Sequence, residues 1–242
     1  MVRRSSIARP FRTCLMVGVR VASDPLRAAP RINRRTRIGF DMVRRPELVL
    51  FDLGGVLIEL RGVGAMAELA GIDDERELWR RWLDCRWVRT FEAGRCGPND
   101  FARGVVVDWG LPVGTDEFLR IFRSWPTGPL DGAEDLVRAT ASVAAIGCFS
   151  NTNTVHWDDN VEHWPIMGHF SHRFLSHRMG EVKPDTAAFE MVADALPIAP
   201  DRILFLDDNL VNVQSARSLG FQGQHVVGVR SAGNALREAG LA

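Results

Sequence analysis

The chain has 242 residues, 46% of them hydrophobic, which is enough to bury a core without disulfide bonds or structural metals. Its formal net charge is zero, but residues 1–41 hold ten arginines against Asp24 and Asp41, so the remainder is acidic and offers no basic face for nucleic acid. Its four cysteines show no metal-binding spacing, and we expect a cytoplasmic protein without nucleic-acid or membrane partners, whose oligomeric state the sequence leaves open.

Residues 1–41 combine many arginines with three prolines and show no apolar periodicity. One apolar run resembles part of an export leader, but Arg20 interrupts it before it reaches the necessary length. We therefore expect a disordered extension here and a folded protein that begins near Met42.

The first predicted strand is the apolar run Leu48–Leu50, which continues into Phe51-Asp52-Leu53-Gly54-Gly55. A carboxylate at the end of a buried strand is typical of a reaction centre at the carboxyl edge of a parallel sheet. The two glycines permit a tight turn and the close approach of a ligand. Asp52 is therefore a candidate nucleophile or metal ligand, although aspartate and glycine are also ordinary turn formers.

Residues 61–127 are predicted to form a small helical bundle, because large apolar side chains recur there at helical spacing. Glycines and prolines divide this region into several helices, with starts predicted at Asn99 or Asp100 and at Thr115 or Asp116. Five of the seven tryptophans lie in it, and we assign most of them to its core rather than to substrate stacking.

Beyond Pro129, strands and helices alternate, which predicts an α/β fold with a parallel sheet covered by helices. Counting the first strand, the sheet has five strands, and residues 42–60 and 128–242 form one domain into which the helical residues 61–127 are inserted. The later strands are expected at 143–149, 173–176, 203–206 and 225–229, and the helices of this domain at 132–141, 154–162, 185–196 and 210–219.

Two of the later segments carry polar residues that suit a phosphate group. Ser150 and Asn151 follow a strand and offer a hydroxyl and an amide where a helix begins, a position that suits phosphate oxygens or a helix N-cap. Lys183 is the single lysine in a chain with 29 arginines. Its retention indicates a site that needs a compact point charge, whereas the ordinary alternative is a solvated side chain.

A third polar pair, Asp207 and Asp208, follows the strand at 203–206. Adjacent carboxylates repel each other, so a cation is expected beside them. Magnesium prefers oxygen ligands and needs one or two carboxylates together with substrate phosphate. Asp208 or Asn209 also suits the N-cap of the following helix, and the two roles are compatible.

Together, FDLGGVL, FSNTN, GEVKPD and FLDDN resemble, in this order, the four motifs of the haloacid dehalogenase superfamily of phosphatases. The resemblance extends from Glu47 to about Val229 and includes the helical insert, which looks like the cap domain of that family. It implies a Rossmann-like core with an inserted cap and the magnesium-dependent hydrolysis of a small phosphorylated metabolite, such as a sugar phosphate, through an aspartyl-phosphate.

The resemblance also implies a role for each motif residue. Asp52 would attack phosphorus, Ser150 and Asn151 would hold phosphate oxygens, and Lys183 would neutralise the charge of both nucleophile and phosphate. Magnesium would be bound by Asp52, the backbone carbonyl of Gly54 and Asp208, with Asp207 in support. These roles match the positioning and charge neutralisation that phosphoryl transfer requires.

Gly54 departs from the family pattern. Most phosphatases of the family carry at this position an aspartate that serves as general acid and base, whereas a subgroup that includes sugar-phosphate phosphatases and the phosphatase domains of epoxide hydrolases shows glycine there. Without that acid, turnover should depend steeply on the acidity of the leaving group, unless another group, such as His156 or a cap residue, supplies the proton.

Two other functions remain open from the sequence. In a haloacid dehalogenase the aspartate attacks carbon and no metal is needed, but Asp207 and Asp208 would then repel a carboxylate substrate. A non-catalytic binding protein that retains the fold is the other alternative, and the presence of Asp52, Lys183 and both later aspartates argues against it.

Overall fold

The computed structural model describes residues 44–241. The disordered extension predicted for residues 1–41 and the start near Met42 lie outside this range. Within the described range, no helix combines the length and the apolar character that a membrane crossing requires.

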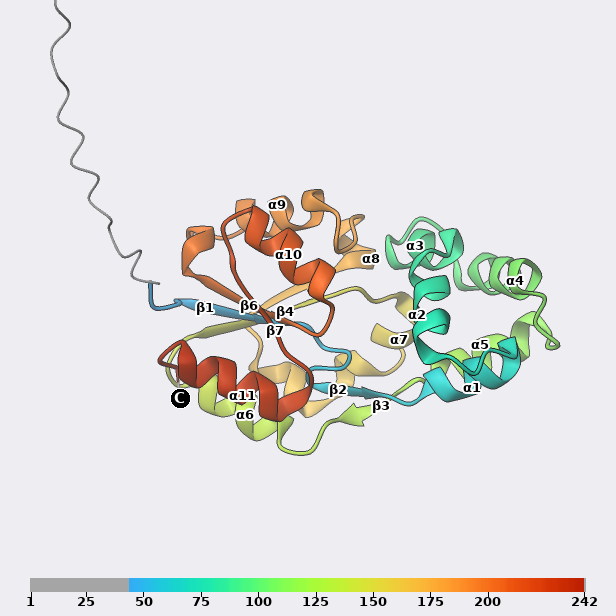
Figure 1. The fold of residues 1–242 in the computed structure, drawn as a ribbon, viewed down its shortest axis with the longest axis horizontal. Coiled ribbons are helices and arrows are strands. Elements are labelled where there is room, and N and C mark those ends of the chain that lie inside the picture. Colours follow the sequence, from blue (N-terminus) through green and yellow to red (C-terminus); the bar gives the residue numbers. More distant parts are fainter. Residues whose placement is uncertain (1–43, 242) are drawn as a thin grey trace, which may run out of the picture. The chain divides into compact units, whose positions relative to one another are not determined.

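The centre of the fold is a five-stranded sheet in the order β5-β4-β1-β6-β7, in which every neighbouring pair is parallel (Figure 1). This arrangement confirms the predicted α/β fold. In a parallel sheet with this order, β1 is the central strand, and its end lies between the ends of β4 and β6. The strands are β1 Leu48–Phe51, β4 Ala145–Ser150, β5 His172–Leu175, β6 Ile203–Asp207 and β7 Gln222–His225.

Both faces of β1 are buried, which explains its continuous apolar sequence. Leu48 and Leu50 pack with residues of α9 and α10, whereas Val49 and Phe51 pack with residues of α6 and α11. These two pairs of helices lie on opposite sides of the sheet (Figure 1). The sheet is therefore covered on both sides. The helices of this core are α6 Ala133–Ala141, α7 Thr154–Trp157, α8 Ser176–Met179, α9 Thr186–Asp194, α10 Leu210–Ser218 and α11 Gly228–Glu238, with 3-10 turns at Val161–His163, Pro165–His169 and Pro200–Arg202.

A helical insert leaves the core after β1 and returns before α6, and we call its helices α1–α5 the cap (Figure 1). It is joined to the core through an antiparallel pair of short strands, β2 and β3. Its interior is aromatic, with Trp82 in edge or tilted contact with Phe101, Trp109 and Trp125. The elements are β2 Ile58–Leu60, α1 Gly62–Ala70, α2 Glu75–Leu83, α3 Arg86–Glu92, α4 Pro98–Trp109, α5 Thr115–Arg123 and β3 Pro126–Pro129.

The last predicted strand was placed too late. The structure has β7 at Gln222–His225, and most of the predicted range 225–229 lies beyond it. The predicted range contains the apolar residues Val226 and Val227. The observed strand is instead a polar edge strand in which Gly223 is the buried residue. Its register comes from pairing with β6, and no apolar alternation marks it.

Further elements differ from the prediction. The helix expected at 154–162 ends at Trp157, because Asn160 leaves helical backbone angles. The β2–β3 pair and the helices α8 and α11 were not predicted. The other strands and helices of the core shift by a few residues at their ends.

Candidate active site

The carboxyl ends of three adjacent strands bring the predicted polar residues together. Asp52 follows β1, Ser150 ends β4, and Asp207 ends β6 with Asp208 directly after it. The backbone N–H of Asp52 donates to the carbonyl of Leu206 at 2.8 Å, which ties the turn after β1 to the neighbouring strand. Because these strands are parallel neighbours, residues far apart in the sequence share one edge of the sheet.

The carboxylate of Asp52 lies at the centre of this edge and is largely buried. Its Oδ1 accepts a hydrogen bond from the backbone N–H of Leu53 at 2.8 Å and lies 3.1 Å from Nζ of Lys183. Burial raises the pKa of Asp52 to about 8; Lys183 lowers it, while Asp207 and Asp208 raise it further. The protein by itself therefore supplies too little positive charge to keep this group fully ionised.

Lys183 reaches the site from the loop before α9, and its side chain is almost fully buried. Its Nζ lies 2.6 Å from Oδ2 of Asp207 and donates to the carbonyl of Phe149 at 2.8 Å. The same atom lies over the ring of Phe205, 5.3 Å from the centroid. Burial alone would lower the pKa of Lys183, but the carboxylates of Asp207 and Asp52 outweigh burial and raise it.

The carboxylate of Asp207 has no exposed surface and is fully engaged by the protein. Besides Lys183, it accepts hydrogen bonds from the backbone N–H of Asn209 at 2.8 Å and from the side-chain amide of Asn212 at 3.0 and 3.1 Å. Asp207 therefore holds Lys183 and the start of α10 in place. Sequence reasoning missed Asn212, and the available signal was an amide placed within the first two turns of a helix that follows two aspartates.

Asn151 is also engaged by its neighbours. Its side-chain amide donates to the carbonyl of Lys183 at 2.9 Å, and its Oδ1 accepts from the backbone N–H of Lys183 at 2.9 Å. The side chain that the sequence suggested for phosphate oxygens thus fixes the backbone of Lys183. Ser150 is buried beside it, and its hydroxyl makes a long contact of 3.4 Å to the Asn151 carbonyl.

Asp208 lies against the glycine turn after β1. A Cβ atom at Gly55 would lie 2.1 Å from Oδ2 of Asp208, so a side chain at this position would displace the carboxylate. Burial, together with the charge of the adjacent Asp207, raises the pKa of Asp208 to about 6. Carboxylate oxygens of Asp52, Asp207 and Asp208 all lie within 4.8 Å of one another.

This cluster fits a magnesium ion in its donor chemistry. Asp207 is saturated, but the carboxylate of Asp208 and the second oxygen of Asp52 accept none of the hydrogen bonds found in residues 44–241. The carbonyl of Gly54 is likewise free within that range, whereas that of Gly55 accepts the N–H of Gly228 at 2.8 Å. Two carboxylates and one carbonyl provide the hard oxygen ligands that magnesium prefers.

His156 was considered from the sequence as a source of a proton, and the structure argues against that role. Its Nε2 lies 2.8 Å from the carbonyl of Phe122 in the cap, and its ring stacks on that of Phe122 with centroids 4.0 Å apart. Burial lowers the pKa of His156 to about 4, partly offset by this hydrogen bond. His156 is therefore neutral, and its contacts with Phe122 connect α7 to α5.

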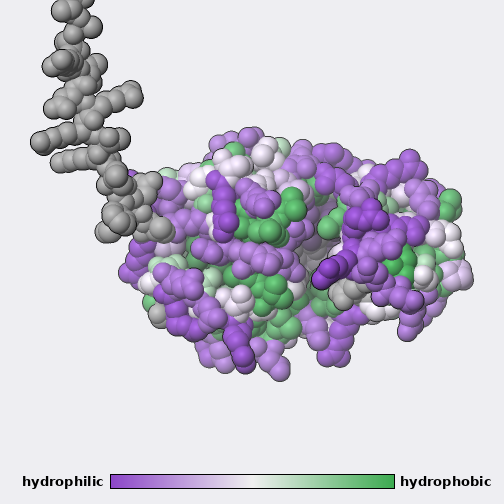
Figure 2. Space-filling view, in the orientation of Figure 1, coloured by the Kyte–Doolittle hydropathy of each residue, from purple (hydrophilic) through white to green (hydrophobic). Residues whose placement is uncertain are grey.

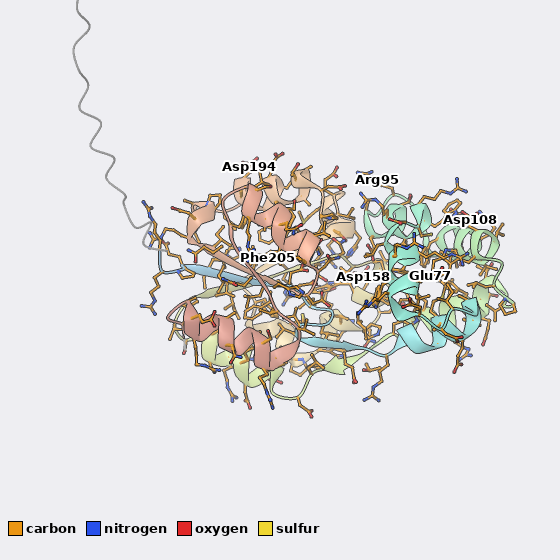
Figure 3. The ribbon with its side chains drawn as sticks, in the orientation of Figure 1. Glu77, Arg95, Asp108, Asp158, Asp194 and Phe205 are labelled. Atoms are coloured by element: carbon orange, nitrogen blue, oxygen red, sulfur yellow. The ribbon has the colours of Figure 1, made fainter. Side chains whose placement is uncertain are left out.

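The end of α3 in the cap touches the core segment that carries Lys183. The guanidinium of Arg89 pairs with Asp185 at 2.7 Å, and Arg95 donates to the carbonyl of Gly180 at 2.6 Å and pairs with Glu181 at 3.1 Å (Figure 3). Sequence reasoning did not identify these contacts. Figure 2 shows the surface hollowed between core and cap, next to this junction.

Comparison with known proteins agrees with this architecture. A family model described as haloacid dehalogenase-like hydrolase matches residues 46–220. Haloacetate dehalogenase H-2 from Moraxella sp. (strain B) is 24% identical over 195 residues, covering 74% of this chain and 85% of the relative. D-ribitol-5-phosphate phosphatase from Bacteroides thetaiotaomicron is 22% identical over 187 residues, covering 72% and 88%.

Among solved structures, this chain is similar to a HAD family enzyme from Bacteroides thetaiotaomicron in complex with magnesium and inorganic phosphate. The two chains superpose with a TM-score of 0.60 at 24% identity, covering 75% of this chain and 94% of the other. At this identity the similarity establishes a shared fold.

Proposed function

The chain belongs to the family of haloacid dehalogenase-like hydrolases, and we propose that within this family it is a magnesium-dependent phosphatase that acts on a small phosphorylated metabolite. The observation that carries this proposal is the pair of carboxylates, Asp52 and Asp208, which lie close together while the nearby ammonium of Lys183 is shared between Asp52 at 3.1 Å and Asp207 at 2.6 Å. Lys183, the buried cation of the site, is committed chiefly to Asp207 at 2.6 Å.

A divalent cation would resolve this electrostatic imbalance. Three carboxylates share the edge of the sheet with one ammonium, so the site carries excess negative charge that a phosphate substrate would increase. Asp52, Asp208 and the carbonyl of Gly54 are the groups that would hold magnesium. When bound, magnesium would neutralise charge on the nucleophile and on the phosphoryl group.

The remaining groups have complementary roles in this proposal. Asp52, held by the Leu53 N–H and by Lys183, would attack phosphorus to form an aspartyl-phosphate. Ser150 and the backbone N–H of Asn151 would bind phosphate oxygens at the end of β4. Lys183 would lie between nucleophile and phosphate, with its orientation set by Asp207 and its backbone by Asn151.

A carbon–halogen hydrolase is the second candidate, because haloacetate dehalogenase H-2 is among the relatives. A haloacid carries its own carboxylate, which would meet Asp52 and Asp208 with no free cation between them. Within residues 44–241 His225 contacts only the backbone carbonyl of Asp208, and a reaction without a metal would leave the Asp208 carboxylate without a partner. The unbalanced pair therefore favours the phosphatase. A binding protein without catalysis would have no need for a buried lysine paired with Asp52.

The test compares the hydrolysis of an aryl phosphate with magnesium and with a chelator. We expect full dependence on magnesium, and Asp52→Asn should reduce turnover to near background, because an amide is neither a nucleophile nor an anionic ligand. Asp194→Asn, which changes an exposed aspartate at the end of α9 (Figure 3), is the matched control and should leave turnover unchanged. Undiminished turnover in chelator, or halide release from a 2-haloacid, would refute the assignment.

A further inference from the structure

Glu92, the last residue of α3, lies between two contacts of the cap with the core. One helical turn before it, Arg89 pairs with Asp185, two residues beyond Lys183. Two residues after it, Gly94 approaches the core so closely that a Cβ there would lie 2.2 Å from the carbonyl oxygen of His177. These two contacts hold the end of α3 against the core next to the candidate site.

The carboxyl group of Glu92 is partly buried and has no hydrogen bond and no ion pair within residues 44–241, although Arg89 lies one turn before it on the same helix. Burial raises the pKa of Glu92 to about 7, while the charges of Lys183 and then Arg89 oppose the rise. Lys183 is thus the stronger of the two cations that act on this carboxyl. With this pKa, a substantial fraction of Glu92 is protonated near neutral pH.

No other described group at the site suits proton transfer to a leaving group. Gly54 has no side chain, and Asp207 is saturated by hydrogen bonds. His156 is neutral and directed at the carbonyl of Phe122. A general acid must be free of other partners and protonated at the working pH, and the unpaired, partly protonated carboxyl of Glu92 meets both requirements.

We propose that Glu92 is the general acid and base of the reaction, supplied by the cap in place of the missing side chain at Gly54. This inference rests on the proposed phosphatase function. In the first step the bond from Asp52 oxygen to phosphorus forms, the phosphorus–oxygen bond to the leaving group breaks, and the proton of Glu92 passes to the departing oxygen. In the second step water attacks the aspartyl-phosphate, Glu92 accepts a proton from that water, and Asp52 and phosphate are released.

The experiment measures kcat/KM with magnesium for two substrates, an alkyl phosphate with a poor leaving group and an aryl phosphate with a good one. The quantity kcat/KM reports steps up to departure of the leaving group, so it isolates the acid role. In Glu92→Gln we expect a loss of about 10²–10⁴-fold for the alkyl phosphate and little change for the aryl phosphate. Because the base of the second step is also lost, aryl phosphate should produce a burst of leaving group and an accumulated phosphoenzyme.

The matched control is Glu181→Gln, which alters a carboxylate at the same junction that pairs with Arg95. It should affect both substrates equally and weakly. A second test is rescue: Gly54→Asp in the Glu92→Gln background should restore alkyl phosphate hydrolysis. A Cβ at Gly54 would meet only the end of the Leu60 side chain, at 2.8 Å, which can move.

Charged groups other than Lys183 and Arg89 lie along the same junction, and they also influence the pH dependence of the reaction. The profile of kcat/KM for the alkyl phosphate should lose its descending limb, the one that reports a protonated acid, in Glu92→Gln. The other charged or titratable residues on the two sides of this junction are Arg95 on the cap and His177, Arg178, Glu181 and Asp185 on the core.

Failure of this inference differs from failure of the proposed function. If the unmodified protein hydrolyses neither phosphate with magnesium, the phosphatase proposal fails. If it hydrolyses both, but Glu92→Gln loses equally on the two substrates or on neither, then Glu92 is not the acid. Equal losses with a changed melting temperature would assign Glu92 a structural role at the junction instead.

Discussion

Replacing Gly55 by alanine tests whether the glycine turn sets the position of Asp208. Gly55 has φ +70°, a conformation that costs an L residue roughly 1–2 kcal/mol. The added Cβ would lie 2.1 Å from Oδ2 of Asp208, and ordinary contact begins at 3.4 Å, so the carboxylate must retreat by about 1.3 Å. A displacement of about 1 Å at a reacting centre can cost about 10²-fold in rate.

The matched control is Gly110→Ala, at the C-cap of α4. Gly110 has nearly the same φ, +64°, but nothing lies within 4 Å of the added Cβ. Both variants should therefore lose roughly 1–2 kcal/mol of unfolding free energy in urea, with some additional loss for Gly55→Ala. In phosphatase assays over a range of magnesium concentrations, Gly55→Ala should need more magnesium and lose about 10²-fold in turnover, whereas Gly110→Ala should match the unmodified protein. Equal magnesium dependence in the two variants would refute the proposed role of Asp208.

Two further predictions concern Lys183 and His156. Lys183→Arg should reduce kcat/KM and stability despite its conserved charge, because the site around Nζ is closed by Phe149 and Asp207 and a planar guanidinium does not fit; unchanged kinetics and urea midpoint would contradict this. For His156, with a folded pKa of about 4 and an unfolded value of 6.5, the unfolded state binds the proton first as the pH falls. Stability should drop by about 3 kcal/mol between pH 6.5 and 4. His156→Gln should remove this part of the pH dependence and exposed His163→Gln should not, as urea unfolding at several pH values will show.

The sequence determined the class of fold and the position of the site's charged groups. An apolar strand buried on both faces has a continuous apolar sequence, so Leu48–Phe51 and Ile203–Leu206 could be recognised locally. Because parallel strands end at one edge of their sheet, the order of the strands along the chain is enough to place Asp52 and Asp207 together. The single lysine of the chain stood out for a compositional reason and lies in the same cluster.

The tertiary structure decided which interactions each of these groups makes. Nothing local distinguishes Asp207 from Asp208, yet the carboxylate of Asp207 is saturated by Lys183 and Asn212, while that of Asp208 accepts no hydrogen bond from another residue of the described range. Asn151 likewise contacts the backbone of a residue 32 positions away. The last strand, Gln222–His225, is defined by its pairing with β6 and by no apolar pattern of its own.

The junction of cap and core is the clearest case of what sequence periodicity cannot supply. Arg89 and Glu92 read as ordinary polar residues on a short helix, because the pattern of that helix records only its contacts inside the cap. Asp185, which pairs with Arg89, and Lys183, whose charge acts on Glu92, lie far along the chain on the core. Burial and electrostatic environment depend on that distant packing, so the raised pKa of Glu92 arises only when the cap is folded against the core.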